Sequence, residues 1–312
     1  MEKKNKYFLI AAGSVLVSLL VLDFVIGLAG DYAMKRIPDY SDQLAKDNFR
    51  LNRVTTDVII VGSSRGAHHY VTTELQDSIN NYTRGHYSLY NGAIDGKFIN
   101  SNSCAAESIM DRYTPSLLIF EVSEEELAGR KAVRDMEFAA VNKKNNQFVK
   151  RYINDLGLKE QLKTSSNMYR YNQQLLRIAS SFLVHGDSTG YEPLYKKMIV
   201  NNLEEEAPNN NRVYDEYSMA NFKRVLKTAN EKGVHLVIVS SPMYKPVDDN
   251  MKLAQICHDY EVPYIELYNL DYFNSRPELF QDRDHLNDEG AHLYTNLFFQ
   301  KLKPFLSHLD KN

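Results

Sequence analysis

From about Thr56 onward, the chain alternates short apolar runs with longer stretches of helical spacing. The first run, Val58 to Val61, is wholly apolar and mostly β-branched, which is typical of a strand buried on both faces of a parallel sheet. Apolar runs separated by helices predict βαβ units. The predicted strands are 58–61, 87–90, 117–122, 236–240 and 263–267. Joined by right-handed crossovers, they predict a flavodoxin-like three-layer α/β/α sandwich with a five-stranded parallel sheet.

A helical insertion is predicted after the third strand, over 128–211. Within it, 146–156 and 168–183 carry apolar and aromatic residues at helical spacing, whereas 204–211 is rich in Glu, Asn and Pro and predicts a loop. An insertion at this edge of the sheet can cover a site and select substrates.

The N-terminal pattern is different. Lys3, Lys4 and Lys6 precede an apolar stretch, 8–28, that is interrupted only by Asp23. The stretch is long enough to cross a bilayer as a helix, and the basic residues would stay in the cytoplasm. An alternative is a signal peptide that is cleaved near the small residues of 27–29. Both interpretations place the following domain outside the cytoplasm.

The resulting organisation has four parts. We expect a cytoplasmic tail at 1–6, a transmembrane signal-anchor at 7–30, a polar juxtamembrane linker at 31–55 and the main α/β domain at 56–312. The protein would be a single-pass protein of the cell membrane, with its domain on the extracytoplasmic side, periplasmic or extracellular.

The composition limits the classes of protein to which this chain can belong. A chain of 312 residues with 43% hydrophobic content can bury one sizeable core. The net charge of -3 offers no basic surface for nucleic acid. Cys104 and Cys257 are expected on separate helices as free buried thiols, although export would permit a disulfide. The chain has no Cys-x-x-Cys or His-Glu-x-x-His spacing, so we expect no metal and no cofactor; a flavin or nucleotide binder would need a Gly-rich loop that the first strand lacks.

The candidate chemistry lies at two distant places. Ser64 ends the Gly62-Ser63-Ser64 turn after the first strand, where a side chain is held at the carboxyl edge of the sheet. The same turn is also ordinary N-cap chemistry. Near the other end of the chain, Asp282 stands three residues before His285. A nucleophilic serine needs a base for its proton and an acid that orients the base. His68 and His69, which follow Ser64, are expected at surface or capping positions.

Three segments together resemble a known family. Gly62-Ser63-Ser64, the stretch from Asn91 to Gly96, and the stretch from Asp282 to His285 are similar to blocks one, two and five of the SGNH (GDSL-like) hydrolases. The resemblance covers most of the chain from Thr56 onward. It implies that Ser64 is the nucleophile, that His285 and Asp282 complete a triad, and that the amides of Ser64 and Gly96 form an oxyanion hole. Ser63 departs from the usual Gly-Asp-Ser.

Block three is the larger departure. The family has an asparagine there that completes the oxyanion hole, and Glu124 or Glu125 holds that place in this chain. A carboxylate would repel a developing oxyanion. Acidic residues at this position also suit the start of a solvated helix. We expect Asn91 and Glu125 to line the substrate pocket, and Asn91, Asn100 and Asn102 are candidates for the missing donor by residue type alone.

Export and the similarity to membrane-anchored SGNH proteins of cell-envelope biosynthesis imply a substrate class. The expected activity is that of a serine esterase or O-acyltransferase, acting on an acylated envelope glycan or lipid through an acyl-serine intermediate. The alternative is a catalytically degenerate SGNH domain that binds an envelope polymer or takes part in assembly. The sequence indicates no particular protein partner.

Overall fold

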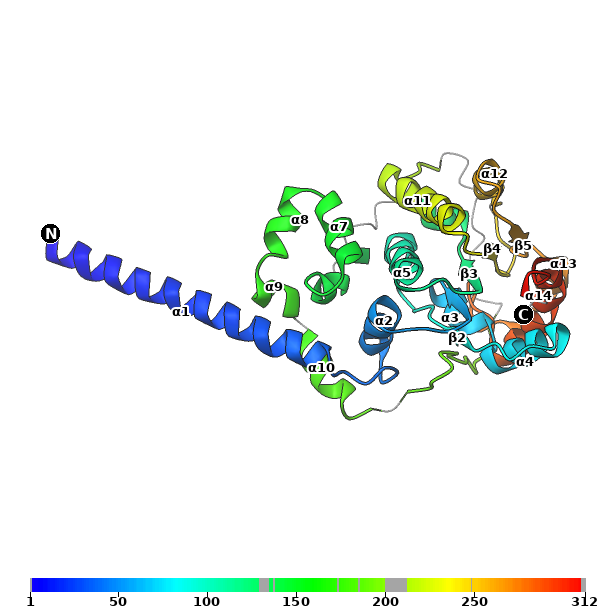
Figure 1. Ribbon diagram of the computed structural model, residues 1–312, viewed down its shortest axis with the longest axis horizontal. Helices are drawn as coiled ribbons and strands as arrows, with labels where there is room; N and C mark the ends of the chain where they lie inside the picture. The colour runs from blue at the N-terminus through cyan, green and yellow to red at the C-terminus, as the bar shows by residue number, and fades with distance from the viewer. Residues whose placement is uncertain are drawn as a thin grey trace.

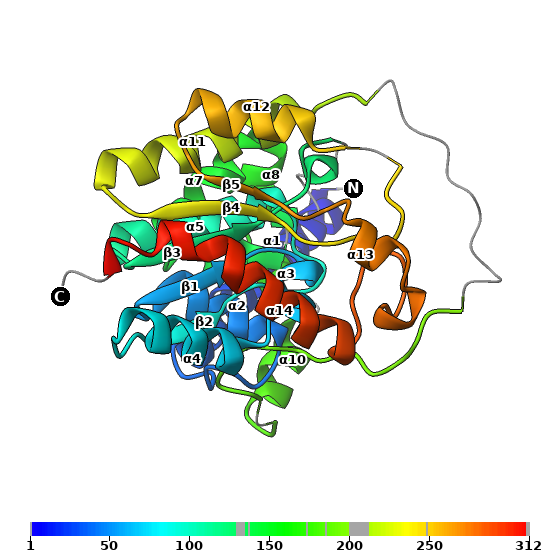
Figure 2. The same cartoon turned by 90° about the vertical axis from the view of Figure 1, so that its right-hand side faces the viewer.

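A computed structural model describes residues 2–128, 135–136, 138–172, 174–184, 186–199, 212–247 and 249–309. Its centre is a sheet of five parallel strands in the order β2-β1-β3-β4-β5 (Figures 1 and 2). The strands are β1 Val58–Val61, β2 Leu89–Asn91, β3 Leu117–Glu121, β4 Leu236–Ser240 and β5 Tyr264–Glu266. The predicted α/β fold is confirmed, with small shifts in the bounds of the second, third and fifth strands.

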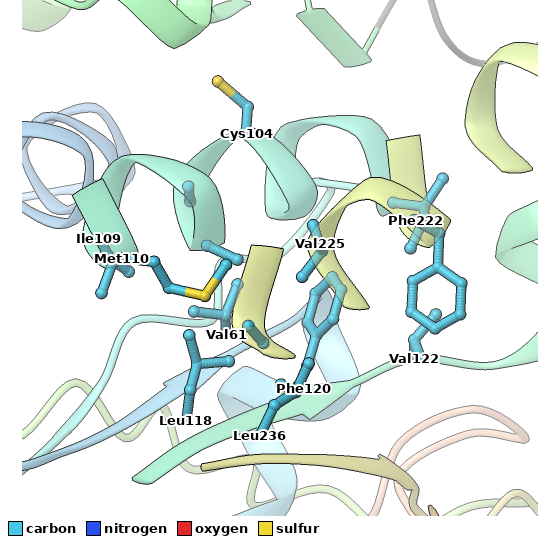
Figure 3. Close-up of a cluster of buried hydrophobic side chains, with 14 of the residues drawn as sticks. Val61, Cys104, Ile109, Met110, Leu118, Phe120, Val122, Phe222, Val225 and Leu236 are labelled. Carbon is cyan, nitrogen blue, oxygen red and sulfur yellow. The ribbon is translucent and has the colours of Figure 1, made fainter. Parts of the chain in front are cut away.

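Alternating side chains of the strands enter two separate cores. Ile59 and Val61 of β1 belong to one cluster of buried residues, and Val58 and Ile60 belong to the other. Helices α5 Ile99–Arg112, α11 Glu216–Lys232 and α12 Met251–Asp259 cover the first face, and α4 Thr72–Thr83 and α14 Asp288–Leu302 cover the second (Figure 2). Figure 3 shows Phe120 of β3 against Phe222 and Val225 of α11. Burial of both faces explains why β1 is uninterrupted by polar residues.

The chain after β3 is helical, as predicted. The predicted segment 146–156 contains α7. The predicted segment 168–183 contains the end of α9 and all of α10. The loop predicted at 204–211 lies outside the described residues. The shorter elements are α2 Gln43–Asn52, α3 Ser64–His69, η1 Glu124–Leu127, η2 Phe138–Asn142, α7 Gln147–Asp155, α8 Leu158–Lys163, α9 Asn167–Tyr171, α10 Gln174–Ser181, α13 Asp271–Asn274, η4 Pro277–Leu279 and η5 Lys303–Phe305.

Helix α2 lies in the region expected to be a polar linker, yet it packs into the domain. Arg50 is fully buried, where it donates to Asp47 at 2.9 Å, to Asn102 at 2.9 Å and to the carbonyl of Gly92 at 3.1 Å. A buried guanidinium requires such a set of partners. Polarity in 31–55 therefore reflects buried hydrogen bonding in α2 as well as exposure.

The N-terminal helix α1 Glu2–Met34 extends away from the sheet (Figure 1). Among the described residues, its segment Asn5–Met34 is the one helix that is long and apolar enough to cross a membrane, judged by length and composition. The two cysteines, Cys104 and Cys257, are free and buried, as expected.

Candidate active site

The structure brings the two distant candidate segments together at the carboxyl edge of the sheet. Ser64 is the first residue of α3, directly after β1. Its Oγ lies 2.7 Å from Nε2 of His285, and Nδ1 of His285 lies 2.8 Å from Oδ1 of Asp282. Since a carboxylate only accepts, Nδ1 carries the imidazole proton and Nε2 accepts the hydroxyl of Ser64. The three side chains thus form an Asp-His-Ser relay in hydrogen-bond order.

Asp282 orders the loop that carries His285. Besides the imidazole, its Oδ1 accepts the backbone amides of Asp284 and His285, each at 3.0 Å. Burial raises the pKa of Asp282, but the hydrogen bond and charge of His285 and the two amides outweigh burial and lower the pKa overall. Asp282 therefore stays a carboxylate, as an orienting acid must.

The pocket in front of Ser64 contains the predicted oxyanion donors. Because Ser64 begins a helix, its amide has no acceptor within that helix. Gly96 has a φ of 71°, a left-handed conformation that favours glycine, and it lines the same pocket. The pocket has a volume of about 190 Å³, and its ionisable lining residues are Arg65, Asp95, Glu125, Glu126 and Asp284. Acidic side chains outnumber basic ones around Ser64.

The predicted pocket residues differ in where they lie. Glu125 is exposed and lines the pocket. Asn91 does not, because it is fully buried at the end of β2, where its amide donates to the carbonyl of Gly66 at 2.8 Å and its oxygen accepts the amide of Ala93 at 3.0 Å. The expectation for Asn91 is therefore wrong: its side chain is used to hold the two loops that flank the pocket.

The other asparagine candidates are likewise occupied by neighbouring side chains. Asn100 lines the pocket, but its amide donates to Ser218 at 2.9 Å and its oxygen accepts from Asn221 at 2.7 Å. Asn102 is fully buried and accepts from Arg50. Neither amide group is directed at Ser64 by these contacts.

Glu124 is not a solvated helix start. It is buried, and its Oε2 accepts the amides of Lys252 and Leu253 at 2.7 and 3.1 Å, at the beginning of α12. Its Oε1 accepts the hydroxyl of Tyr214. Glu124 thus ties the loop after β3 to α12, and only Glu125 and Glu126 of the three acids line the pocket.

Glu126 has an unusual environment. Its Oε1 accepts the hydroxyl of Ser63 at 3.1 Å, while its Oε2 is buried with no hydrogen-bond partner among the described residues. Burial raises the pKa of Glu126 to about 8, although the charge of Arg65 acts in the opposite direction. At neutral pH this group is mostly a neutral carboxylic acid, which can donate a hydrogen bond. Ser63, the departure in block one, is therefore paired with an acid of block three.

A buried polar network lies beneath the triad, and the sequence analysis missed it. Glu121 is fully buried at the end of β3 and accepts the hydroxyls of Tyr70 and Ser241 at 2.6 and 2.9 Å. Nε of Arg65 lies 3.5 Å from the same carboxylate. Burial raises the pKa of Glu121, and Arg65 together with the hydrogen bonds opposes that shift. The one available signal was a glutamate that ends an otherwise apolar strand.

His69 links this network to the loop of the base. Its Nε2 accepts the amide of Leu286 at 2.9 Å, so Nδ1 carries the proton and donates to Oγ of Ser241 at 2.9 Å. Burial, together with the charges of His285 and Arg65, holds the pKa of His69 well below its usual range. His69 is a neutral positioning residue for the residue after His285. The surface position expected for His68 and His69 is wrong, because both are buried.

A second cavity adjoins the first. It is lined by Gln43, Leu44, Asp47, Asp95, Gly96, Lys97, Gln174 and Arg177, and it also measures about 190 Å³. Asp95 and Gly96 line both cavities, so the loop after β2 separates them. The second cavity extends the site from Ser64 to α10 of the insertion.

No protein-family model matches the sequence, and no curated protein matches it. Several solved structures are similar. The lipase/acylhydrolase from Enterococcus faecalis is 10% identical with a TM-score of 0.40, over 79% of this chain and 95% of that one. A structure described as a lipolytic protein of the G-D-S-L family from Desulfitobacterium hafniense DCB-2 is 9% identical with a TM-score of 0.38, over 79% and 99%. A two-domain esterase active on acetylated mannans is 12% identical with a TM-score of 0.38, over 89% and 55%.

Proposed function

We propose that this protein is an SGNH-type serine esterase or O-acyltransferase that works through an acyl-serine intermediate. The observation that carries the proposal is the continuous hydrogen bonding from Asp282 through His285 to Ser64, from segments 221 residues apart. Nucleophilic catalysis requires these two contacts in this order. At a pocket that is half exposed to solvent, no structural role explains them equally well.

The chemistry follows from the geometry. Oγ of Ser64 attacks the ester carbonyl as its proton passes to Nε2 of His285, while Asp282 stabilises the imidazolium. The tetrahedral oxyanion is held by the amides of Ser64 and Gly96. The intermediate collapses when the leaving alcohol takes the proton from His285. Water or an acceptor hydroxyl then loses a proton to His285 and attacks the acyl-serine, and Ser64 leaves as its Oγ takes that proton back from His285.

The substrate class rests on location and on the two cavities. An apolar N-terminal helix preceded by lysines supports a cell-membrane protein whose domain faces the extracytoplasmic side. We propose that the cavity at Ser64 receives the acyl group and that the cavity at α10 receives the alcohol part, an envelope glycan or lipid. The polar lining of the second cavity suits hydroxyl groups.

A fluorophosphonate probe tests this proposal. The purified full-length protein is expected to be labelled, and Ser64→Ala is expected to lose labelling and to lower hydrolysis of p-nitrophenyl acetate by at least about 10³-fold. Ser63→Ala is a matched control at the neighbouring serine, and it should still be labelled. A wild-type protein that neither reacts with the probe nor cleaves the ester would sink the proposal.

The acids around Ser64 favour a second candidate, a degenerate SGNH domain that binds an envelope polymer. Glutamates stand where the family has an oxyanion donor, and ionised side chains there oppose acyl transfer. In that case the unlabelled wild type would still bind an isolated envelope polysaccharide, and Arg177→Ala in the second cavity would weaken that binding.

A further inference from the structure

The insertion forms hydrogen bonds with the C-terminal part of the N-terminal helix α1. Asp23 of α1 accepts the hydroxyl of Ser166 at 2.7 Å, the amide of Met168 at 2.8 Å and the side-chain amide of Asn167 at 2.9 Å. All three donors come from the start of α9. The residue that interrupts the apolar stretch of the sequence is thereby satisfied by the insertion.

Small residues of α1 allow this close approach. A Cβ at Gly27 would lie 2.5 Å from Asn167, and one at Gly30 would overlap the ring of Tyr171. The hydroxyl of Tyr171 in turn donates to Asp31 at 2.6 Å. Figure 1 shows α9 and α10 beside the C-terminal part of α1, while the rest of α1 extends beyond them. The insertion and α1 are therefore one packed unit.

The same insertion exposes large apolar side chains. Leu158 and Leu162, one turn apart on α8, are 69% and 62% exposed, and Leu176 of α10 and Leu183 after it are 83% and 82% exposed. Other exposed members of this set are Met168, Leu175, Phe182 and Val184. Leu158 and Leu162 thus form one uncovered apolar group on α8, and a second group lies on α10 and the residues after it. Uncovered apolar groups of this kind mark surfaces that contact a partner or a membrane.

Basic side chains accompany them. A shallow cavity between η2, α7, α8 and α9 is lined by Lys143, Lys144, Lys150 and Arg170. The lining also contains Thr164, Ser165 and Asn167 and no acidic residue. Arg170 and Lys144 pair with Asp31, whereas Lys150 is exposed and forms no ion pair with the described residues. Leucines beside cationic groups are typical of a surface that lies at the lipid–water boundary.

We propose that the segment from η2 to Val184 is a membrane-docking surface, with its exposed leucines in the acyl-chain boundary and its basic cavity among anionic phospholipid headgroups. The occupant is the leaflet on the side of the membrane where the domain lies. The free part of α1, Asn5 to Leu22, is about 27 Å long at 1.5 Å per residue, close to the roughly 30 Å hydrocarbon core. Asp23 and its partners on α9 then lie at the boundary, where polar groups are tolerated.

This inference rests on the proposed membrane anchoring and not on the proposed catalysis, and the test separates them. The sequence has no tryptophan, so a single introduced tryptophan is the only indole fluorophore. Full-length Leu162→Trp and Leu176→Trp are placed in vesicles of phosphatidylcholine and phosphatidylglycerol, with or without bromine near the headgroup end of the acyl chains. Leu16→Trp on α1 is the positive control. Met251→Trp, 73% exposed on α12 at the far side of the domain, is the negative control.

We expect brominated lipid to quench the emission of Leu162→Trp and Leu176→Trp roughly twofold and to leave Met251→Trp unchanged. Quenching of Leu16→Trp without quenching at either insertion position would overturn the proposal. A blue-shifted but unquenched emission at both positions would overturn it as well, because a second copy of the chain or another protein would then cover the leucines. The probe-labelling experiment on Ser64 is unaffected by either result.

The proposed contact between the basic cavity and anionic headgroups has a separate control. Lys150→Glu should lessen the quenching of Leu162→Trp in vesicles with phosphatidylglycerol and have no effect in pure phosphatidylcholine. Lys227→Glu, an exposed lysine on α11, should change neither. An equal effect of Lys150→Glu in both lipids would contradict the proposed role of anionic headgroups.

Discussion

Two sets of polar residues meet at α3 and differ in how they are held. The triad faces solvent, with the side chains of His285 and Asp282 exposed by 21% and 51%. The network beneath it, Glu121 with Arg65 and His69, is almost completely buried. Charges near water are solvated whether or not a partner is present, whereas a buried charge depends on its partners. We therefore expect the triad to determine the rate and the network to determine the stability that keeps the triad in place.

The largest effect on rate beyond Ser64 itself should come from Asp282→Asn. The change keeps the shape but allows the wrong imidazole tautomer, so kcat/KM should fall by about 10² to 10⁴-fold. The free energy of unfolding should change by less than about 1 kcal/mol because Asp282 is half-exposed. Ester hydrolysis and urea unfolding of the same preparations measure both quantities. A stability loss as large as that of Glu121→Ala would contradict the division between the two sets.

Glu121→Ala should show the opposite behaviour. Its removal leaves Arg65 buried without the carboxylate, and it leaves Tyr70 and Ser241 without their acceptor, so unfolding should become easier by about 3–5 kcal/mol. Glu74→Ala is the matched control, because Glu74 forms an exposed pair with His292 that is worth about 0–1 kcal/mol. Equal unfolding midpoints for the two variants would disprove the stabilising role of the network.

Glu126 belongs to both sets, since it is half-buried, with a buried Oε2, and yet lines the pocket. Its pKa of about 8 in the folded protein lies above the unfolded value near 4.5. Between these values the folded state keeps a proton that the unfolded state has lost, so the contribution of Glu126 to stability declines as pH rises from about 4.5 to 8. We expect Glu126→Gln to flatten that part of the stability profile in urea titrations.

The same group should set the alkaline limb of activity. Above about pH 8 an ionised Glu126 repels the oxyanion, so wild-type kcat/KM should fall by roughly threefold to tenfold by pH 9.5. Glu126→Gln, which stays neutral, should keep its activity there. Glu125→Gln is the control at the exposed neighbour and should retain the wild-type decline. Identical alkaline limbs for Glu126→Gln and wild type would exclude this role.

The smallest effect concerns the second cavity. Gln174→Ala and Arg177→Ala should raise KM for an acylated oligosaccharide by roughly threefold to tenfold and leave hydrolysis of p-nitrophenyl acetate unchanged, because the small ester does not reach α10. Lys159→Ala, an exposed residue of α8, serves as the control. A parallel change for both esters would show that these residues act on the triad or on folding.

The sequence was informative where the relation between residue and role is local. The strands, the turn that presents Ser64 and the three-residue spacing of Asp282 and His285 are properties of short segments. Their meeting required only that Ser64 and the His285 loop lie at the same sheet edge, and parallel strands with right-handed crossovers ensure this.

The remaining parts of the site depend on burial, which a short segment does not reveal. Glu124, Glu125 and Glu126 are identical in type, yet one caps α12, one faces solvent and one is a neutral acid in the pocket. His69 and Asn91 have polar side chains that stabilise loops from inside the domain. Which glutamate or asparagine faces the nucleophile is set by the order of the strands and by the packing of α12 against the loop after β3.

The helix from Asn5 to Met34 is unbroken, and the start of α9 is hydrogen-bonded to its Asp23. The apolar segment is therefore joined to the domain by rigid helix and not by a flexible linker. Asp23 and Met34 are eleven helical steps apart, a rise of about 17 Å. In the proposed orientation, the domain stays at a fixed distance from the membrane and does not move away from it to reach a distant polymer. With the proposed anchoring and the proposed esterase activity, we expect the domain to act on esters within reach of the membrane surface and not on distant polymer.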